Sequence, residues 1–263
     1  MIVAGIDVGS LTAKTVLLDD TKNILASSIV LTRAKSRQAA QDSLDESLKL
    51  AGLKLGDIFY TLGTGYGREN VPSPNSTLSE ITCHARGAHF LIPEVRTVID
   101  IGGQDSKVIS IGERGNVTDF NMNDKCAAGT GRFLDVMAHA LEVDLNDMGK
   151  LSLQSKKEVQ VSSMCTVFAE SEVISLIADN CDITDIIAGI HTSIARRVGS
   201  MVTRVGVRDK TVMTGGVAKN IGVVRALEKE LGTTITVPEE PQIIGALGAA
   251  LHGLDRATKE IAG

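Results

Sequence analysis

Two stretches of the chain share one pattern of apolar and polar positions. GIDVGSLTAKTVLL (5–18) and VIDIGGQDSKVISI (98–111) each read as an apolar strand that ends on Asp, a turn through Gly, and a second strand that begins near a Lys. Asp7 matches Asp100 at an offset of 93 residues, and the two lysines match at the same offset. Each copy is followed by a turn and a further strand-like run, so each half of the chain is predicted to begin with a β-meander.

Apolar residues at helical spacing predict the elements that follow the meanders. The predicted helices span 77–92, 130–142, 166–178 and 183–206. Thr77 and Glu80 have the spacing of a capping box at the start of the first helix. Asp182 precedes the last helix as a candidate N-cap, and apolar positions recur there at intervals of three and four residues. The first half is therefore expected to close with one helix and the second half to carry three.

A third glycine turn lies further along the chain, in TVMTGGVAKNIGVVRALEKELG (211–232). This stretch reads as a strand, the pair Gly215-Gly216 and a helix. A last strand, TITVP, leads to a helix of small residues, IIGALGAALHGL (243–254). No low-complexity linker separates these pieces, which favours two lobes packed around a cleft.

The predicted fold class is α/β, with strands and helices distributed between two lobes. We expect lobe I, with the first hairpin, to comprise residues 1–96 and 243–263. Lobe II, with the second hairpin and the third glycine turn, is expected to comprise residues 97–242.

Composition and charge narrow the function classes. The 263 residues are 43% hydrophobic, enough for two modest lobes with a real core. A net charge of -5, no Trp, two Tyr and five Phe argue against a nucleic-acid groove, which needs basic stripes and stacking platforms. No run approaches the roughly 20 apolar residues that span a bilayer, and the N-terminus lacks the basic flank of a signal peptide. We expect a cytoplasmic protein with reduced thiols and no nucleic-acid or membrane partner.

The glycine turns suit a bound polyphosphate. A strand that ends in Asp and turns through Gly exposes backbone N–H groups and keeps side chains out of the way of a phosphate. Two such hairpins facing each other would clamp a polyphosphate, and Asp7 and Asp100 would hold Mg²⁺ through waters. Gly215 and Gly216 would let a nucleoside lie against the backbone. One such turn alone is as well explained as a tight hairpin, but three in this order favour a nucleotide site.

The order of these turns, with the small-residue helix near the C-terminus, resembles the actin, Hsp70 and sugar-kinase ATPase superfamily. GIDVGSLTAK, VIDIGGQDSK and VMTGGVAKN match its phosphate-1, phosphate-2 and adenosine motifs, and the helices at 79–91 and 243–253 look like its two interdomain connectors. The resemblance implies two ribonuclease-H-like lobes around a nucleotide cleft, which open and close on ATP. Neither a P-loop nor a Rossmann fingerprint competes with it.

The matched motifs imply particular site residues. Those expected to bind ATP or ADP are Gly9, Ser10, Thr12, Lys14, Gly102, Gly103, Gln104, Lys107, Gly215, Gly216 and Asn220. The catalytic candidates are Asp7, Asp100 and Asp105, with Asp105 as a candidate to position water. Leu11 departs from the pattern, since the superfamily often has Thr there. It stays open whether Ser10, Thr12 or only the backbone meets the phosphates.

Four cysteines raise a second question of chemistry. Cys83, Cys126, Cys165 and Cys181 show no C-x-x-C spacing, so neither a zinc ribbon nor a thioredoxin-type site is expected. We expect Cys83 and Cys181 to be buried thiols that pack as small apolar groups. Cys126 and Cys165 each stand at a predicted helix start, where the helix dipole and free N–H groups stabilise a thiolate.

A cubane iron–sulfur cluster needs four thiolates, and the chain offers two good ones. A symmetric dimer resolves this count, because an isologous contact near a two-fold axis brings Cys126 and Cys165 of both subunits together around one cluster. Gly129 and Gly131 would let the chain turn tightly beside Cys126.

The resemblance sharpens to one family on longer stretches. TGYGR, SEITCHARGA, VIDIGGQDSKVI, NMNDKCAAGTGRFLDVMA, CTVFAESEVIS, DIIAGIH and VMTGGVAKN look like signatures of the ATP-dependent activators of 2-hydroxyacyl-CoA dehydratases, in the BadF/BadG/BcrA/BcrD ATPase family. The resemblance implies a homodimer in which Cys126 and Cys165 ligate one shared [4Fe–4S] cluster. It also implies an ATPase that takes an electron from ferredoxin or flavodoxin and delivers it to a separate dehydratase.

Other functions of the same fold remain as alternatives. A small-molecule kinase would use Asp100 as a base toward a substrate hydroxyl but would not need two cysteines at helix starts. An actin-like scaffold ATPase would polymerise with ATP and stay colourless. For Glu170 and Glu172, after Cys165, we favour a solvated helix face over catalysis. His84, His89 and His191 lack ligand spacing, which favours packing or surface roles.

Overall fold

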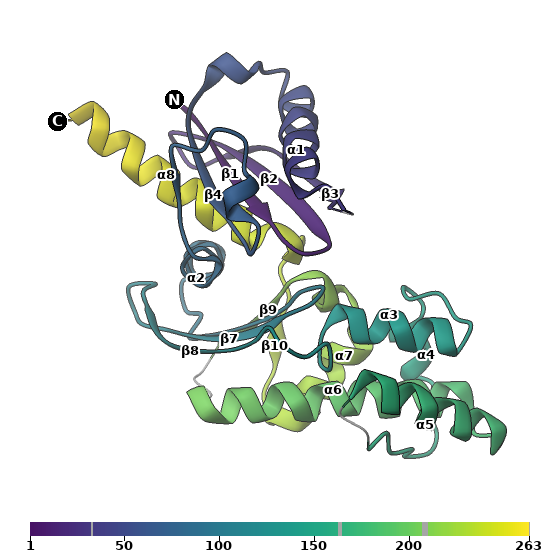
Figure 1. Ribbon diagram of the computed structural model, residues 1–263. Coiled ribbons are helices and arrows are strands. Elements are labelled where there is room, and N and C mark those ends of the chain that lie inside the picture. Colours follow the sequence, from purple (N-terminus) through teal and green to yellow (C-terminus); the bar gives the residue numbers. More distant parts are fainter. Residues whose placement is uncertain (33, 163–164, 207–209, 263) are drawn as a thin grey trace. The chain divides into compact units, whose positions relative to one another are not determined.

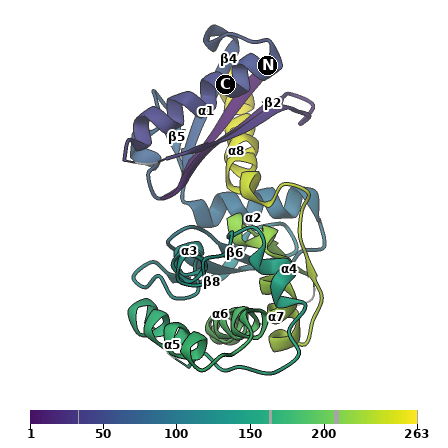
Figure 2. The ribbon, with the colours of Figure 1, turned by 90° about the vertical axis from the view of Figure 1, so that its right-hand side faces the viewer.

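The computed structural model describes residues 1–32, 34–162, 165–206 and 210–262, and the chain forms two compact units (Figure 1, Figure 2). The first unit comprises Met1–Val95, Ile111–Thr118 and Glu239–Gly263, and the second comprises Arg96–Ser110 and Asp119–Pro238. Each unit has its own five-stranded sheet with helices. The lobe boundaries at 96/97 and 242/243 stay predictions.

The sheet of the first unit has the strand order β3-β2-β1-β4-β5. Its strands are β1 (Ile2–Val8), β2 (Thr12–Asp19), β3 (Ile24–Leu31), β4 (Ile58–Thr64) and β5 (Ser76–Thr77). β2 pairs antiparallel with β1 and β3, whereas β4 pairs parallel with β1 and β5. The predicted meander is confirmed, and β4 adds a parallel partner for β1.

Helices cover both faces of this first sheet. They are α1 (Ser36–Ala51), α2 (Glu80–Leu91) and α8 (Ile244–Ala262), with short 3-10 turns at Leu55–Asp57, Arg68–Asn70 and Pro241–Ile243. Figure 2 shows α1 and α8 on opposite faces of this sheet. Alternate residues of β1 point to opposite faces, so Val3 packs with α8 while Ile6 packs with α1. A β-carbon on Gly5 would collide with the main chain of α8, and glycine there lets strand and helix touch.

The sheet of the second unit has the strand order β10-β9-β6-β7-β8. Its strands are β6 (Thr97–Ile101), β7 (Ser106–Ile111), β8 (Val117–Asn123), β9 (Thr211–Thr214) and β10 (Ile235–Thr236). β6 pairs antiparallel with β7 and parallel with β9, and β9 pairs parallel with β10. Read from the other edge, this is the arrangement of the first sheet, with β6 in the place of β1 and β9 in the place of β4.

The described residues of the second unit form five helices. They are α3 (Gly131–Ala140), α4 (Met148–Ser152), α5 (Thr166–Ala178), α6 (Ile183–Val205) and α7 (Ile221–Leu231), with a 3-10 turn at Gly216–Lys219. Ile99 and Ile101 of β6 join one buried cluster with Phe133 of α3, Ile190 of α6 and Val223 of α7. None of the described helices combines the length and the apolar character that crossing a bilayer requires.

The predicted helices after the second meander are confirmed, and Asp182 caps α6 by accepting a hydrogen bond from the Thr184 N–H at 2.8 Å. The capping box at Thr77 is wrong. Thr77 belongs to β5, and Ser79 is the N-cap of α2, where its hydroxyl accepts from the Ile81 N–H at 3.3 Å. A hydroxyl residue stands at both positions, and pairing of β5 with β4 decides between them.

Candidate functional site

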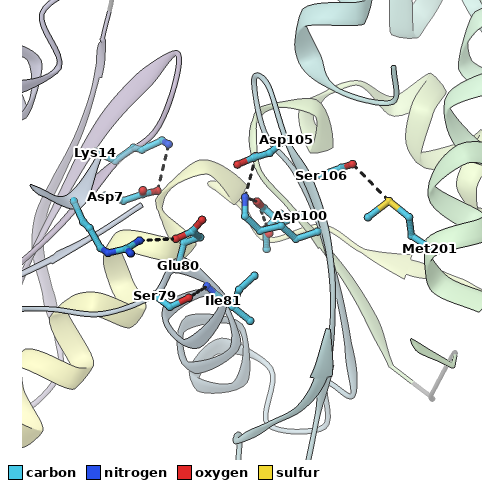
Figure 3. Close-up of polar contacts among 12 residues, drawn as sticks. Asp7, Lys14, Ser79, Glu80, Ile81, Asp100, Asp105, Ser106 and Met201 are labelled. Carbon is cyan, nitrogen blue, oxygen red and sulfur yellow. Dashed lines mark hydrogen bonds and ion pairs between the residues drawn. The ribbon is translucent and has the colours of Figure 1, made fainter. Parts of the chain in front are cut away.

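The first hairpin places an ion pair at the end of β1. Asp7 and Lys14 are direct partners in the β1–β2 ladder, and Lys14 Nζ lies 3.3 Å from Asp7 Oδ2 (Figure 3). The Asp7 carboxylate is almost fully buried. Gly9 closes the turn, since its N–H donates to the Thr12 carbonyl at 3.0 Å. The pair therefore stands beside the turn that is expected to meet a phosphate.

Thr32, which follows β3, holds the tip of this hairpin by two hydrogen bonds. The Thr32 hydroxyl donates to the Gly9 carbonyl at 3.1 Å, and the Thr32 N–H donates to the Leu11 carbonyl at 2.8 Å. Ser10 is half-buried, and the side chain of Leu11, which departs from the superfamily pattern, is exposed. All predicted residues of the first motif thus lie in one hairpin of the first unit, with Gly9 and Ser10 in its turn and Thr12 and Lys14 in β2.

The second hairpin repeats the geometry with more partners. Lys107 Nζ lies 3.3 Å from Asp100 Oδ2 and 2.9 Å from Asp105 Oδ1 (Figure 3). The Gly102 N–H closes the turn on the Asp105 carbonyl at 2.9 Å, and Gln104 is exposed at the tip. Asp105 therefore lies beside Asp100, and its carboxylate shares Lys107 with that of Asp100.

Thr64 and Thr214 are a further pair of equivalent residues, which the sequence pattern did not reveal. Asp7 stands opposite Thr64 in the parallel β1–β4 ladder, and Asp100 stands opposite Thr214 in the β6–β9 ladder. The next residues, Gly65 and Gly215, have φ of +92° and +84°. A β-carbon on either would collide with the neighbouring Asp carboxylate and main-chain carbonyl, so glycine lets both loops close over the Asp. TLGTG (61–65) and TVMTG (211–215), at an offset of 150, carry the signal.

The third glycine turn leads into α7. Gly215 and Gly216 follow β9, and Asn220 is the N-cap of α7, where its Oδ1 accepts from the N–H groups of Gly222 and Val223 at 3.0 and 3.1 Å. Because Oδ1 is engaged, Nδ2 of Asn220 is the atom that faces Nε2 of His191, at 3.3 Å. The predicted residues Gly215, Gly216 and Asn220 therefore share one loop in the second unit.

His191 supports this loop as a neutral side chain. An amide N–H₂ donates to its Nε2, so that nitrogen is an acceptor and the ring carries its proton on Nδ1. Burial lowers the pKa of His191 to about 4. His191 is buried, as a packing role predicts, and it also contacts Asn220 in the third glycine turn.

The first unit buries two further ionisable side chains, His84 and Glu80. A β-carbon on Gly245 would lie 2.9 Å from both Asp7 Oδ2 and His84 Nε2, so this glycine of α8 leaves room for both side chains. Glu80, in the first turn of α2, is buried, and its Oε2 lies 3.5 Å from Arg68 Nη1 (Figure 3). No spacing in the sequence indicated Glu80 as a site residue, because its neighbours come from other elements.

The two candidate cluster cysteines have different surroundings. Cys165 is exposed and is the N-cap residue of α5, as predicted. Cys126 is half-buried and lies in the loop between β8 and α3, four residues before the N-cap Thr130, so its placement at a helix start is wrong. Asn123 Nδ2 donates to the Cys126 carbonyl at 2.7 Å and holds this loop.

The other two cysteines differ in burial. Cys83 is fully buried in α2, as expected, and burial raises the pKa of its thiol to about 12. Cys181 is half-buried and packs against the core of the second unit. Among the described residues, no three His, Cys, Asp or Glu side chains come together as a metal site within one chain.

The loop of Cys126 is connected to the second glycine turn. The Gly131 N–H donates to the Gly102 carbonyl at 2.9 Å, and the Arg132 N–H donates to the Gly103 carbonyl at 2.8 Å. The first residues of α3 are thus bonded to the main chain of the phosphate-2 turn. Only four residues separate Cys126 from Gly131, so a short loop connects the cysteine to the helix that is bonded to this turn.

Known proteins share this architecture. The (R)-2-hydroxyglutaryl-CoA dehydratase activating ATPase of Acidaminococcus fermentans is 52% identical over 97% of this chain and 98% of its own length. The solved activator of the 2-hydroxyisocaproyl-CoA dehydratase from Clostridium difficile, with bound ADPNP, has a TM-score of 0.95 at 49% identity and covers 100% of this chain and 97% of its own. A ROK family glucokinase from Streptomyces griseus has a TM-score of 0.58 at 14% identity, covers 97% of this chain and 100% of its own, and shares the fold alone.

These similarities confirm the predicted sugar-kinase-like ATPase fold. The model of the BadF/BadG/BcrA/BcrD ATPase family matches residues 4–253, which include both hairpins, the third glycine turn and all four cysteines. The chain therefore belongs to the BadF/BadG/BcrA/BcrD ATPase family.

Proposed function

We propose that this protein is the ATP-dependent activator of a 2-hydroxyacyl-CoA dehydratase. It works in the cytoplasm as a homodimer, takes one electron from ferredoxin or flavodoxin and delivers it to the dehydratase with hydrolysis of ATP. Relatives that are about half identical over nearly the whole chain bear the names of such activators, for different acyl groups. The class of partner is therefore a 2-hydroxyacyl-CoA dehydratase. Each 0.3 V of uphill drive costs about 7 kcal/mol per electron, which is why such a transfer needs ATP.

The nucleotide is held by the residues of the three glycine turns. Backbone N–H groups of the turns that begin at Gly9 and Gly102 face the phosphates, and Gly215, Gly216 and Asn220 lie against the nucleoside. Asp7 and Asp100 are buried carboxylates at strand ends, the type of ligand that holds Mg²⁺ through waters. Lys14 and Lys107, within 3.3 Å of them, supply positive charge beside the phosphates.

Cys126 and Cys165 fit a [4Fe–4S] cluster shared by two subunits. Both are free thiols with some exposure, and two such pairs supply the four thiolates. Cys165 is the N-cap residue of α5, and the partial positive charge of a helix start favours a bound group of negative charge there. When bound, the cluster would supply one-electron transfer at low potential.

The outer face of α5 supports the dimer. Val167, Phe168 and Ile174 are apolar and more than half exposed, although they share the helix with Cys165. A second copy of this face would cover them and bring the two Cys165 residues toward one axis.

The observation that carries the coupling is the bonding of α3 to the phosphate-2 turn. The carbonyls of Gly102 and Gly103 accept from the first N–H groups of α3, and the Cys126 loop leads directly into that helix. A change in the turn on ATP hydrolysis therefore shifts the loop that carries one of the two cluster ligands. Asp100 and Asp105 respond to the phosphates, and Lys107 ties them together.

Anaerobic purification tests the proposal. We expect a brown dimer with about four iron and four sulfide, and loss of both in Cys126→Ser and Cys165→Ser. Cys83→Ser and Cys181→Ser are the controls and should keep the full iron content. A colourless wild-type protein, or a full cluster in either of the first two variants, would overturn the assignment.

A further inference from the structure

The segment that precedes Cys165 has no regular secondary structure. Residues 155–162 run between α4 and α5 without a helix or strand of their own. A ligand at the end of an unsupported segment would be poorly fixed. Three contacts from α5 and α6 hold the segment.

The first contact is with Asp185 in the opening turn of α6. Its buried Oδ1 accepts from the N–H groups of Lys156 and Lys157 at 2.6 and 3.0 Å and from the Ser155 hydroxyl at 2.9 Å. The backbone N–H of Lys157, with that of Lys156, lowers the pKa of this carboxyl. The start of the segment is thus fixed to α6 by a charged acceptor.

The second contact is a close approach one turn further along α6. A β-carbon on Gly189 would collide with the carbonyl of Val159, so glycine lets the segment lie directly on the helix. Val161 is buried there and belongs to the core of the second unit. The middle of the segment therefore packs on the same helix as its start.

The third contact is with Glu172 of α5. The Ser162 N–H lies 2.9 Å from Oε1 and 3.1 Å from Oε2 of Glu172, and the Ser162 hydroxyl lies 2.9 Å from Oε1. The expectation that Glu172 only solvates its helix face is therefore wrong. Glu170, on the same helix, makes no comparable bond within the described part of the chain.

We propose that Glu172 is a positioning residue for Cys165. It stands two helical turns after the cysteine and holds Ser162, three residues before the cysteine, so Ser162 and Cys165 are both attached to α5. Asp185 fixes the far end of the same segment. This inference rests on the proposed role of Cys165 as a cluster ligand, and it assigns to Glu172 the orientation of that ligand.

The test compares Glu172→Ala with Glu170→Ala, a matched change on the same helix. Iron release to a chelator, measured anaerobically on the intact dimer, should be about tenfold faster in Glu172→Ala, the size typical for loss of a group that orients a metal ligand. The EPR spectrum of the reduced protein should change in that variant. Glu170→Ala should match the wild type in both.

Two milder variants keep the test decisive if Glu172→Ala does not fold. Glu172→Gln retains an acceptor for the Ser162 N–H and should restore most of the iron retention, and Ser162→Ala should lose iron a few-fold faster. Wild-type protein without iron would overturn the proposed function together with this inference. A wild-type cluster with equal release rates and spectra in Glu172→Ala and Glu170→Ala would overturn the inference alone.

Discussion

The two glycine hairpins of this protein have the same backbone and different side-chain partners. In both, an Asp at the end of the central strand stands opposite a Lys, with the two side chains 3.3 Å apart. In both, the parallel neighbour strand ends in Thr followed by a Gly of positive φ. The ladder register thus produces the same ion pair twice.

The difference lies in what surrounds each pair. Lys107 is shared by Asp100 and Asp105, and the Thr214 hydroxyl donates to Asp100 Oδ1 at 2.8 Å. In the first unit the Thr64 hydroxyl turns away and donates to the Leu78 carbonyl at 3.0 Å. The second hairpin is therefore the more interlocked of the two, and it is the one bonded to α3. In the proposed mechanism, the first hairpin binds the nucleotide, and the second hairpin also transmits the state of the nucleotide to α3.

Replacing the two lysines should produce the largest difference between the hairpins. Lys107→Met removes the buried cation that the buried Asp100 shares with the half-buried Asp105, and we expect a loss of about 3 kcal/mol in unfolding free energy. Lys14→Met leaves only Asp7 unpaired and should lose about half as much. The loss of ATP affinity should be larger for Lys14→Met than for Lys107→Met. Lys14 is paired with one carboxylate and Lys107 with two, so Lys14 is freer to meet a phosphate. Urea unfolding measures the loss of stability, and an ATP-binding assay measures the loss of affinity. Equal losses of stability in the two variants would contradict the difference between the hairpins.

Replacing the two threonines should produce a smaller difference between the hairpins. Thr214→Val removes a donor to the buried Asp100 carboxylate and should cost about 2 kcal/mol and lower ATP turnover several-fold. Thr64→Val removes a bond to a main-chain carbonyl, which should cost about 1 kcal/mol and leave turnover nearly unchanged. Steady-state ATPase assays measure this difference. An equal fall in turnover in both variants would contradict it, and unchanged turnover in Thr214→Val would show that catalysis does not depend on the bond from Thr214 to Asp100.

Lowering the pH should destabilise the second unit through His191, and this is the smallest of the predicted effects. The unfolded chain protonates this histidine near pH 6.5, whereas burial lowers its pKa to about 4 in the folded chain. Protons therefore favour unfolding as the pH falls below 6.5, by about 1 kcal/mol at pH 5.5. His191→Gln lacks this dependence. Urea unfolding at pH 7.5 and 5.5 should show a smaller decrease for the variant, and equal decreases would mean that His191 is already charged in the fold.

The sequence was most informative where local pattern determines structure. The offset of 93 identified Asp7 and Asp100 because both hairpins are contiguous in the chain. It did not identify Thr64, which reaches Asp7 through a parallel pairing of distant strands. Helix α1 was not predicted, since its buried face combines Leu44 and Leu48 with Ala and Ser and leaves a weak apolar stripe.

The cysteines show the same limit of local pattern. The helical period after Cys165 predicted α5 and placed the cysteine at its start. The loop of Cys126 was expected to be a helix start, but Thr130 is the N-cap, and bonds from α3 to Gly102 and Gly103 fix the beginning of that helix. Such contacts join segments that are about 30 residues apart, and no local spacing records them.

Asp100→Asn, a nearly isosteric change in the second hairpin, tests most directly whether ATP hydrolysis controls electron delivery. We predict that ATP turnover falls about a hundredfold, the size typical for loss of a charged group that organises the transition state. Iron per dimer and reduction by dithionite should stay at the wild-type level, because the cysteines lie on other segments of the second unit. Activation of a 2-hydroxyacyl-CoA dehydratase by the same sample should fail. Normal activation by a variant that lacks ATPase activity would contradict the account.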